Sequence, residues 1–145
     1  MATATRKAVR QQLATLLTAE LVTAQSLVQA VYSYRIGDFQ GQSPVVVVSS
    51  GGSQRIPLTF EGTKPTYQIL VHVFVVYSTE DGTWTEEDAE NALDDIEEAI
   101  SGVIAANDAL DNYWISLGVN GKSVADSVEI GGVEYRREII ELEVG

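Results

Sequence analysis

Apolar residues recur every three to four positions in two stretches of the chain, and this spacing predicts two amphipathic helices. The first helix runs from about residue 5 to 22, with a break expected between residues 21 and 26. The second covers residues 86–106, and Thr85 is well placed to cap its N-terminus. Its outward positions are acidic, with no Lys or Arg among them, so packing of its apolar stripe must hold this helix in place.

The segment Tyr67–Tyr77 is apolar on both of its alternating faces, which predicts a strand in the middle of a sheet with cover on each side. Gly131 and Gly132 separate two strand-like segments, and glycine reaches the positive φ angles of a two-residue hairpin turn. The strand after this turn continues to about residue 144. Residues 107–125 have the composition of a loop, with room for one short strand.

A further hairpin is predicted in the first half of the chain. Residues 32–43 have a loop composition, and the β-branched run Val45–Val48 then favours a strand. We expect a turn at residues 49–53, a returning strand at 55–60 and a connection at 61–65. Because Pro57 lacks an amide donor, the returning strand should lie at a sheet edge or contain a bulge.

These elements together predict one α+β domain over residues 1–145. We expect a small antiparallel or mixed β-sheet with two main helices packed on it.

Charge is distributed unevenly over a chain of net charge −12. Residues 1–79 hold six basic and three acidic side chains, whereas residues 80–145 hold three basic and 18 acidic ones. An acidic half argues against sequence-specific nucleic-acid binding, which needs clustered Lys and Arg to displace counterions from phosphates. It suits a surface to which DNA must not adhere.

Residue types leave little room for catalysis or a cofactor. The chain has no cysteine and a single histidine, which excludes disulfides, thiolate sites and multi-histidine metal centres. We therefore expect no enzyme activity, no cofactor and no metal. No segment reaches the roughly 18 apolar residues of a membrane span, and Glu20 interrupts the only stretch resembling a signal peptide, so we expect neither a membrane partner nor a leader.

Three patterns could carry chemistry, and each has a simpler interpretation. The segment Ser49–Ser53 has the composition of a phosphate-binding loop but leads into a strand, which favours a turn. His72 could act with Ser50 or Glu61, although a hydrogen-bonded histidine within a sheet fits better. The carboxylates of helix 86–106 lie one turn apart and could bind a divalent cation weakly, but a solvated acidic face explains them.

Aromatic residues suggest contacts with other proteins. Trp84 and Trp114 are candidate interface anchors, with burial in the core of the chain itself as the equal alternative. Tyr32, Tyr34 and Arg35 could form a small nucleic-acid-stacking surface, but a core or subunit contact explains them better.

In layout the chain resembles the tail terminator, or tail completion, proteins of long-tailed bacteriophages. The resemblance covers most of the chain: the leading helix, the valine hairpin at residues 32–60, and the segments YQILVHVFVVY, WTEEDAENALDDIEEAISGVIAAN and VEIGGVEYRREIIELEV. It implies a small sheet with helices packed against it. It also implies a structural virion protein, assembled in the host cytoplasm, that forms a hexameric ring at the head-proximal end of the tail.

The resemblance implies four partners for such a ring: other copies of the chain, the tail tube protein, the head–tail connector or stopper protein, and DNA that passes without sequence-specific binding. The ring caps the tube, ends its polymerisation and provides the surface on which the head connector docks. No family motif fixes the contact residues, so we select them from the sequence itself. The candidates for subunit or partner contacts are Arg35, Asp38, Phe39, Arg55, Trp114, Arg136 and Arg137. The candidates for an acidic surface or channel are Glu90, Asp94 and Glu97.

Two alternatives stay open at this stage. The first is another protein of the same region, either a head–tail stopper, a connector adaptor or a tail tube subunit, which would differ in its partners rather than in its chemistry. The second is a small enzyme or ligand-binding module with a pocket between helix 86–106 and the sheet, lined by His72 and a nearby carboxylate.

Overall fold

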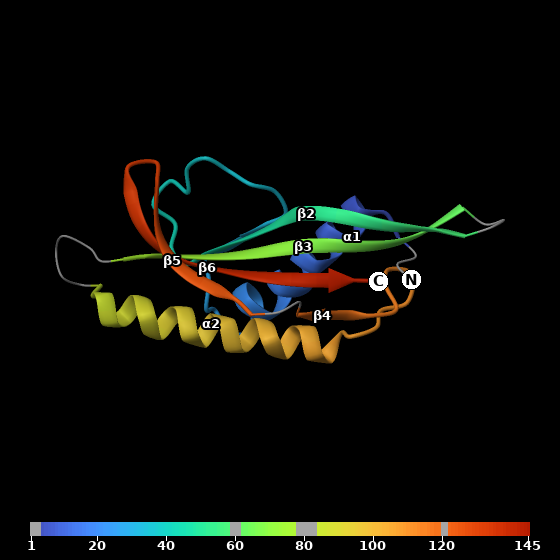
Figure 1. Ribbon diagram of the computed structural model, residues 1–145. Coiled ribbons are helices and arrows are strands. Elements are labelled where there is room, and N and C mark those ends of the chain that lie inside the picture. The colour runs from blue at the N-terminus through green and yellow to red at the C-terminus, as the bar shows by residue number, and fades with distance from the viewer. Residues whose placement is uncertain (1–3, 59–61, 78–83, 120–121) are drawn as a thin grey trace.

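The computed structural model describes residues 4–58, 62–77, 84–119 and 122–145, and at residues 56–58 and 62–64 it describes only the backbone (Figure 1). The chain forms a mixed six-stranded sheet and two main helices. This confirms the expected α+β class with a mixed sheet. In Figure 1 the helices lie partly beside the sheet, with α2 running along the strands. The elements, in chain order, are α1 (Arg6–Leu17), η1 (Thr18–Ala24), β1 (Ala30–Tyr32), β2 (Val45–Leu58), β3 (Gly62–Val76), α2 (Glu86–Ala106), β4 (Leu117–Val119), β5 (Val124–Ile130) and β6 (Val133–Val144).

The sheet has the strand order β1-β2-β3-β6-β4, and β5 also pairs with β6. β1 is parallel to β2, and the other pairs are antiparallel. Two strands pair with the edge of β6 that faces away from β3: β5 pairs with residues 133–139, and β4 pairs with residues 142–144. β3 lies between β2 and β6, as the two-sided apolar pattern of Tyr67–Tyr77 predicted.

The two faces of β3 belong to two separate hydrophobic clusters. Val71, Val73 and Val75 join apolar residues of α1, η1 and α2 in the larger cluster. Phe74 lies on the opposite face, in a smaller cluster with Val45, Val47, Phe39 and Tyr135. One sheet face is thus buried with the helices, and the other is covered by the loop before β2 and by the β5–β6 hairpin.

Both helices begin as the sequence predicted. Thr5 caps α1, and Thr85 caps α2 in a capping box, in which Asp88 N–H donates to the Thr85 hydroxyl and Thr85 N–H donates to the Asp88 carboxylate. α1 continues into the π-helical segment η1, which ends at Ala24, and Ser26 follows with φ 53°. The expected break between residues 21 and 26 is therefore confirmed.

The predicted turn at residues 49–53 and the returning strand at 55–60 are wrong. β2 runs without interruption from Val45 to Leu58, and β3 already begins at Gly62, within the expected connection. A register shift between Ser50 and Gly52 marks a bulge where the turn was expected. Phe60 and Glu61 lie outside the described residues. Beyond residue 47, β2 pairs only with β3 among the described residues, so Pro57 lies on an edge strand as expected.

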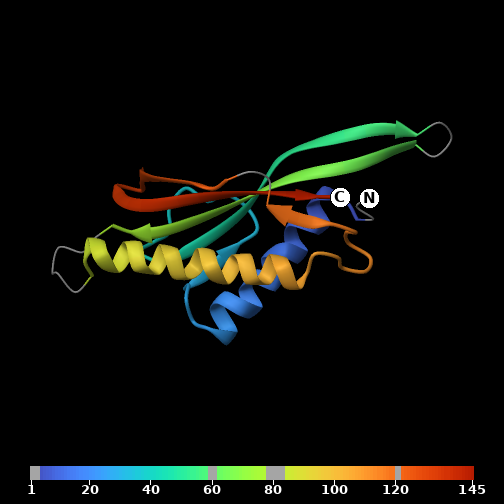
Figure 2. The same cartoon turned by 60° about the horizontal axis from the view of Figure 1, so that its bottom comes forward.

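β2 and β3 extend beyond the rest of the sheet as a two-stranded arm. β6 pairs with β3 only from Tyr67 onward, whereas β2 pairs with β3 as far as Leu58 and Gly62. Residues 54–58 and 62–66 therefore form a ribbon without a third strand among the described residues, and Figure 2 shows it projecting from the body. We call these residues the arm.

The Gly-Gly hairpin and the short strand within residues 107–125 are confirmed. Gly131 and Gly132 have φ angles of 59° and 80°, and they connect β5 to β6. β4 is the short strand. The sequence did not predict β1, and Tyr32, its last residue, was expected in the loop at residues 32–43.

Candidate functional site

The loop between β1 and β2 is anchored by an aromatic residue. The Phe39 ring lies 4.8 Å from the Phe74 ring and 5.3 Å from the Tyr135 ring, between centroids, and Phe39 is only 2% exposed. Phe39 is therefore a core residue and does not offer its ring to a partner. It holds the loop, cyan in Figure 1, against the sheet face opposite the helices.

Asp38 lies beside the Gly-Gly turn. A Cβ atom added to Gly131 would lie 3.0 Å from the Asp38 carboxyl carbon, so glycine allows this approach. The same carboxylate accepts a 2.8 Å hydrogen bond from Gln40 N–H. Asp38 and Arg35 are both exposed in this loop. The structure thus brings the loop candidates Arg35 and Asp38 to the β5–β6 end of the molecule.

His72 lies beneath this end and is 4% exposed. Its Nε2 lies 3.1 Å from Ser49 Oγ, and its Nδ1 is buried without a hydrogen-bond partner among the described residues. Burial is the main cause that lowers the pKa of His72 to about 4; the positive charges of Arg35 and Arg137 act in the same direction, and Asp126 opposes them. The expected hydrogen-bonded histidine is thus satisfied at one nitrogen only.

The candidate pairing of His72 with Ser50 is not formed among the described residues. Its partner is Ser49 rather than Ser50, and Glu61 lies outside the described residues. His72 stacks on Phe74, on the sheet face opposite α2. It therefore cannot line a pocket between α2 and the sheet, as the enzyme alternative required.

Arg136 and Arg137 are engaged within the chain. Arg137 makes a bidentate pair with Asp126, with donor–acceptor distances of 2.9 and 2.6 Å. Arg136 Nε donates to Glu90 on α2 at 2.6 Å. Both arginines connect elements of the same molecule, so their role in contacts with a partner stays a prediction.

The two tryptophans also have internal roles. Trp114 is 2% exposed, belongs to the larger hydrophobic cluster, and donates from Nε1 to the carbonyl of Asn107 at 2.8 Å. Trp114 is thus buried in the core of the chain itself, the alternative that the sequence left open, and a role in contacts with a partner stays a prediction. Trp84 Nε1 donates to the carbonyl of Val76 at 2.8 Å, which ties the start of α2 to the end of β3.

The candidate acidic residues share one flank of α2. Glu90 pairs with Arg136 of β6, Glu97 accepts a 3.1 Å hydrogen bond from Ser101, and Asp94 is exposed. This flank faces the β6 side of the molecule. Within the described parts of the chain, no group of three or more His, Asp or Glu residues is arranged to hold a metal ion. Nor does any described helix have the length and apolar character needed to span a bilayer.

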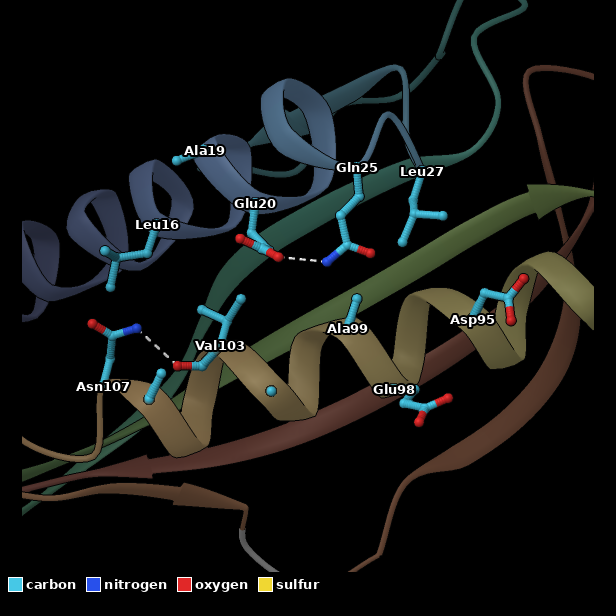
Figure 3. A pocket seen from close by; sticks show the side chains of 12 residues that line it. Leu16, Ala19, Glu20, Gln25, Leu27, Asp95, Glu98, Ala99, Val103 and Asn107 are labelled. Carbon is cyan, nitrogen blue, oxygen red and sulfur yellow. Dashed lines mark hydrogen bonds between the residues drawn. The ribbon is translucent and has the colours of Figure 1, made fainter.

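A groove separates α1 and η1 from α2 (Figure 3). It has a volume of about 740 Å³. The floor is apolar, and the rim carries the carboxylates of Glu20, Asp95 and Glu98. We call this feature the acidic groove. Its apolar lining residues are Leu16, Ala19, Leu27, Ala99, Val103 and Ala106.

Four basic residues surround a second hollow, of about 530 Å³, where α1 meets β2. Arg6 Nη1 donates to Ser53 Oγ at 2.9 Å, and Arg10 Nη1 lies 3.5 Å from Ser50 Oγ. The Arg55 guanidinium lies 5.9 Å from the centre of the Tyr67 ring. We call Arg6, Lys7, Arg10 and Arg55 with these two serines the basic patch. The two ion pairs of the described residues involve none of these cations.

Sequence reasoning selected only Arg55 from the basic patch. The positive charge of residues 1–79 was the signal for the others, but it did not show that β2 passes beside the first turn of α1. Arg55 lies near Tyr67, at the opposite end of β2 and β3 from the loop candidates Arg35 and Asp38.

No protein-family model matches the chain, and no curated protein matches it. We therefore infer the function of the chain from its residues and from the geometry described above.

Proposed function

We propose that the chain is a ring-forming structural subunit of a bacteriophage tail, a tail terminator that caps the tail tube. In this role it stops tube polymerisation and provides the docking surface for the head connector or stopper. The proposal combines the sequence resemblance with one structural observation, which is the projecting arm. The α+β class, with a mixed sheet and two main helices, accords with the fold that the resemblance implies.

The arm supports the proposal because a two-stranded ribbon is marginally stable in water by itself. Among the described residues, no third strand pairs with either edge of the arm, and such open edges pair readily with another chain. A monomer has little use for a ribbon that projects from its body. A subunit that must hold its neighbours, or the end of a tube, gains a large contact area from it.

The charge of the chain fits a ring around passing DNA. With a net charge of −12, the subunit repels phosphates, and Glu90, Asp94 and Glu97 contribute to this negative surface or channel in our proposal. Candidate contacts at the β5–β6 end are Arg35 and Asp38, which are exposed there. No chemistry is needed for this role, and we propose no enzyme activity or cofactor.

Light scattering and negative-stain microscopy of the purified protein test the proposal, alone and mixed with tail tube subunits. Closed rings, or caps on the ends of tubes, are the expected result. Long tubes assembled from the protein itself would instead indicate a tube subunit. A monomer that binds neither itself nor tubes would overturn the proposal.

Charge reversal of Glu90, Asp94 and Glu97 together tests the acidic surface separately. We expect the variant to form rings that bind DNA and hinder its passage, whereas DNA passes through the wild-type ring without adhering. Unchanged assembly and unchanged DNA passage would show that these residues have no such role.

A further inference from the structure

The basic patch and the acidic groove lie at opposite ends of the same helical segment. The patch involves the first turn of α1, and the groove involves its last turn and η1. About ten residues separate Arg6 from Leu16, which corresponds to roughly 15 Å along a helix. One molecule therefore presents two surfaces of opposite charge.

Neither surface is neutralised within the described chain. Glu20 accepts a hydrogen bond from the uncharged Gln25, and the two described ion pairs do not include Asp95 or Glu98. On the basic side, Arg10 Nε is buried without a hydrogen-bond partner among the described residues. Clustered like charges of this kind are stabilised when the opposite charge approaches them.

The two surfaces also match in polarity. The acidic groove combines an apolar floor with carboxylates on its rim, which suits Arg and Lys side chains that bury their methylene stems and keep their charged ends at the edge. The hydroxyls of Ser50 and Ser53 already hold Arg10 and Arg6 in position, which lowers the entropy lost on binding.

We propose that the basic patch of one copy binds the acidic groove of a second copy, head to tail. This inference rests on the proposed ring, and it names the joint between neighbouring subunits. A joint between two different surfaces can be repeated around a closed ring. It also provides the attraction that subunits of net charge −12 need to approach one another.

A second copy fits the patch better than DNA does. The patch has four cations, a small number for counterion release from a duplex, and they belong to a strongly acidic chain. The same chain carries three carboxylates, those of Glu20, Asp95 and Glu98, on the rim of a groove with an apolar floor, and the described ion pairs include none of them.

Charge reversal on each side tests the joint. One variant carries Arg6→Glu and Lys7→Glu, and the other carries Asp95→Lys and Glu98→Lys; all four positions are exposed, so both variants should fold. A control with Glu86→Lys and Glu87→Lys changes the charge by the same amount as the groove variant, at two exposed positions in the first turn of α2 that line neither the groove nor the patch. Circular dichroism confirms folding before each assembly is measured by native mass spectrometry and microscopy.

We expect the control to form rings like the wild type, and each joint variant alone to need a concentration about tenfold higher or more. An equal mixture of the two variants should restore rings, because every joint then pairs either the original or the exchanged charges. The restored rings should contain both variants in equal numbers.

Several results would overturn the joint while leaving the ring proposal intact. These are wild-type-like rings from either joint variant alone, a mixture that does not recover, or a patch variant that keeps its rings and loses only DNA binding. A mixture that stops at dimers would show a two-fold contact instead of a head-to-tail one. A wild-type protein that forms no rings, with or without tubes, would overturn the ring and the joint together.

Discussion

The His72 ring has one nitrogen bonded to Ser49 and the other buried without a partner among the described residues. A protonated imidazole would place a second donor there and a positive charge beside Arg35 and Arg137. The lowered pKa keeps the ring neutral at neutral pH, and so the fold avoids a buried charge.

This lowered pKa predicts a loss of stability in mild acid. In the unfolded chain His72 titrates near 6.5 and in the folded chain near 4, so the unfolded state binds the extra proton between these values. The contribution of His72 to the free energy of unfolding is fully present above pH 6.5, and it is lost progressively as the pH falls to about 4. Between about pH 7 and 4.5, the free energy of unfolding should fall by about 2 kcal/mol more in the wild type than in His72→Gln.

Urea denaturation of both proteins at the two pH values measures this difference. Equal losses in the two proteins would show that His72 is not the titrating group. Titration of Asp126 does not affect this comparison. The hydrogen bond from Arg137 is the main cause that lowers the pKa of Asp126, so the stability that its carboxylate contributes is lost only below the usual carboxyl range.

Single residues were the least predictable level of this structure. Trp114 and Phe39 look like surface anchors because large aromatic residues serve at interfaces, yet both are buried in the chain's own clusters. Arg136 and Arg137 gave no sign of their carboxylate partners, because Glu90 lies 46 residues away in sequence and Asp126 on a neighbouring strand. Such pairs are set by sheet register and helix placement, which a local pattern does not contain.

Among the elements, α2 was the most predictable because its periodicity and its cap agree. The capping box satisfies backbone groups that would otherwise lack partners, and Thr85→Ala removes one side of it. We expect this substitution to lower the free energy of unfolding by about 1 kcal/mol.

Thr15→Ala in α1 is the matched control for the cap. Thr15 is exposed within the helix, and alanine has the higher helix propensity, so this variant should be as stable as the wild type or slightly more so. Equal stability of Thr85→Ala and the wild type in urea titrations would show that the cap contributes nothing measurable.

The β2–β3 hairpin shows why turn composition misled the sequence reading. Ser49–Ser53 has the residues of a turn, but these residues pair across to Tyr67–Leu70 and stay in the sheet. The glycines serve a bulge: a Cβ atom on Gly51 would lie 3.1 Å from Leu70, and Gly52 has φ 146°. Whether such a segment forms a turn or a bulge depends on the strand that pairs with it, and that strand is distant in sequence. The same holds for β1, whose three residues form a strand because they pair with β2.

The contact between the β5–β6 turn and the loop predicts a coupled effect of two substitutions. Gly131→Ala introduces both a strained φ of 59° and a close contact with the Asp38 carboxyl, and should destabilise the protein by about 1 kcal/mol or more.

Asp38→Ala should recover part of this loss in the double variant, because it removes the contact and leaves the strain. Gly132→Ala is the control, since its Cβ meets no atom within 4 Å and Asp38→Ala should not rescue it. Additive effects of Gly131→Ala and Asp38→Ala in thermal unfolding would contradict a direct contact.

At the scale of the molecule, the residues divide into a body with two clusters and an arm, and none of the side chains described in the arm belongs to either cluster. The sequence predicted the class of the body, since β3, α2 and the Gly-Gly hairpin each carry a strong local pattern. It did not predict the arm, the acidic groove or the basic patch. Each of these arises where segments distant in sequence meet, or where strands continue beyond their neighbours.

Because the arm lies outside both clusters, its removal should separate stability from assembly. Replacing residues 55–65 with Asn-Gly joins Gln54 to Thr66, which are paired in the sheet, through a turn that suits a two-residue hairpin. The melting temperature should change by no more than a few degrees, because none of the replaced residues whose side chains are described belongs to a buried cluster. Ring formation and binding to tube ends should both be lost, because a neighbour no longer has the exposed strand edges to bind. Calorimetry and microscopy on the same preparation measure the two quantities. If the variant melts far below the wild type, the arm contributes to the stability of the monomer. If the variant still forms rings, the arm is not needed for the contacts between subunits.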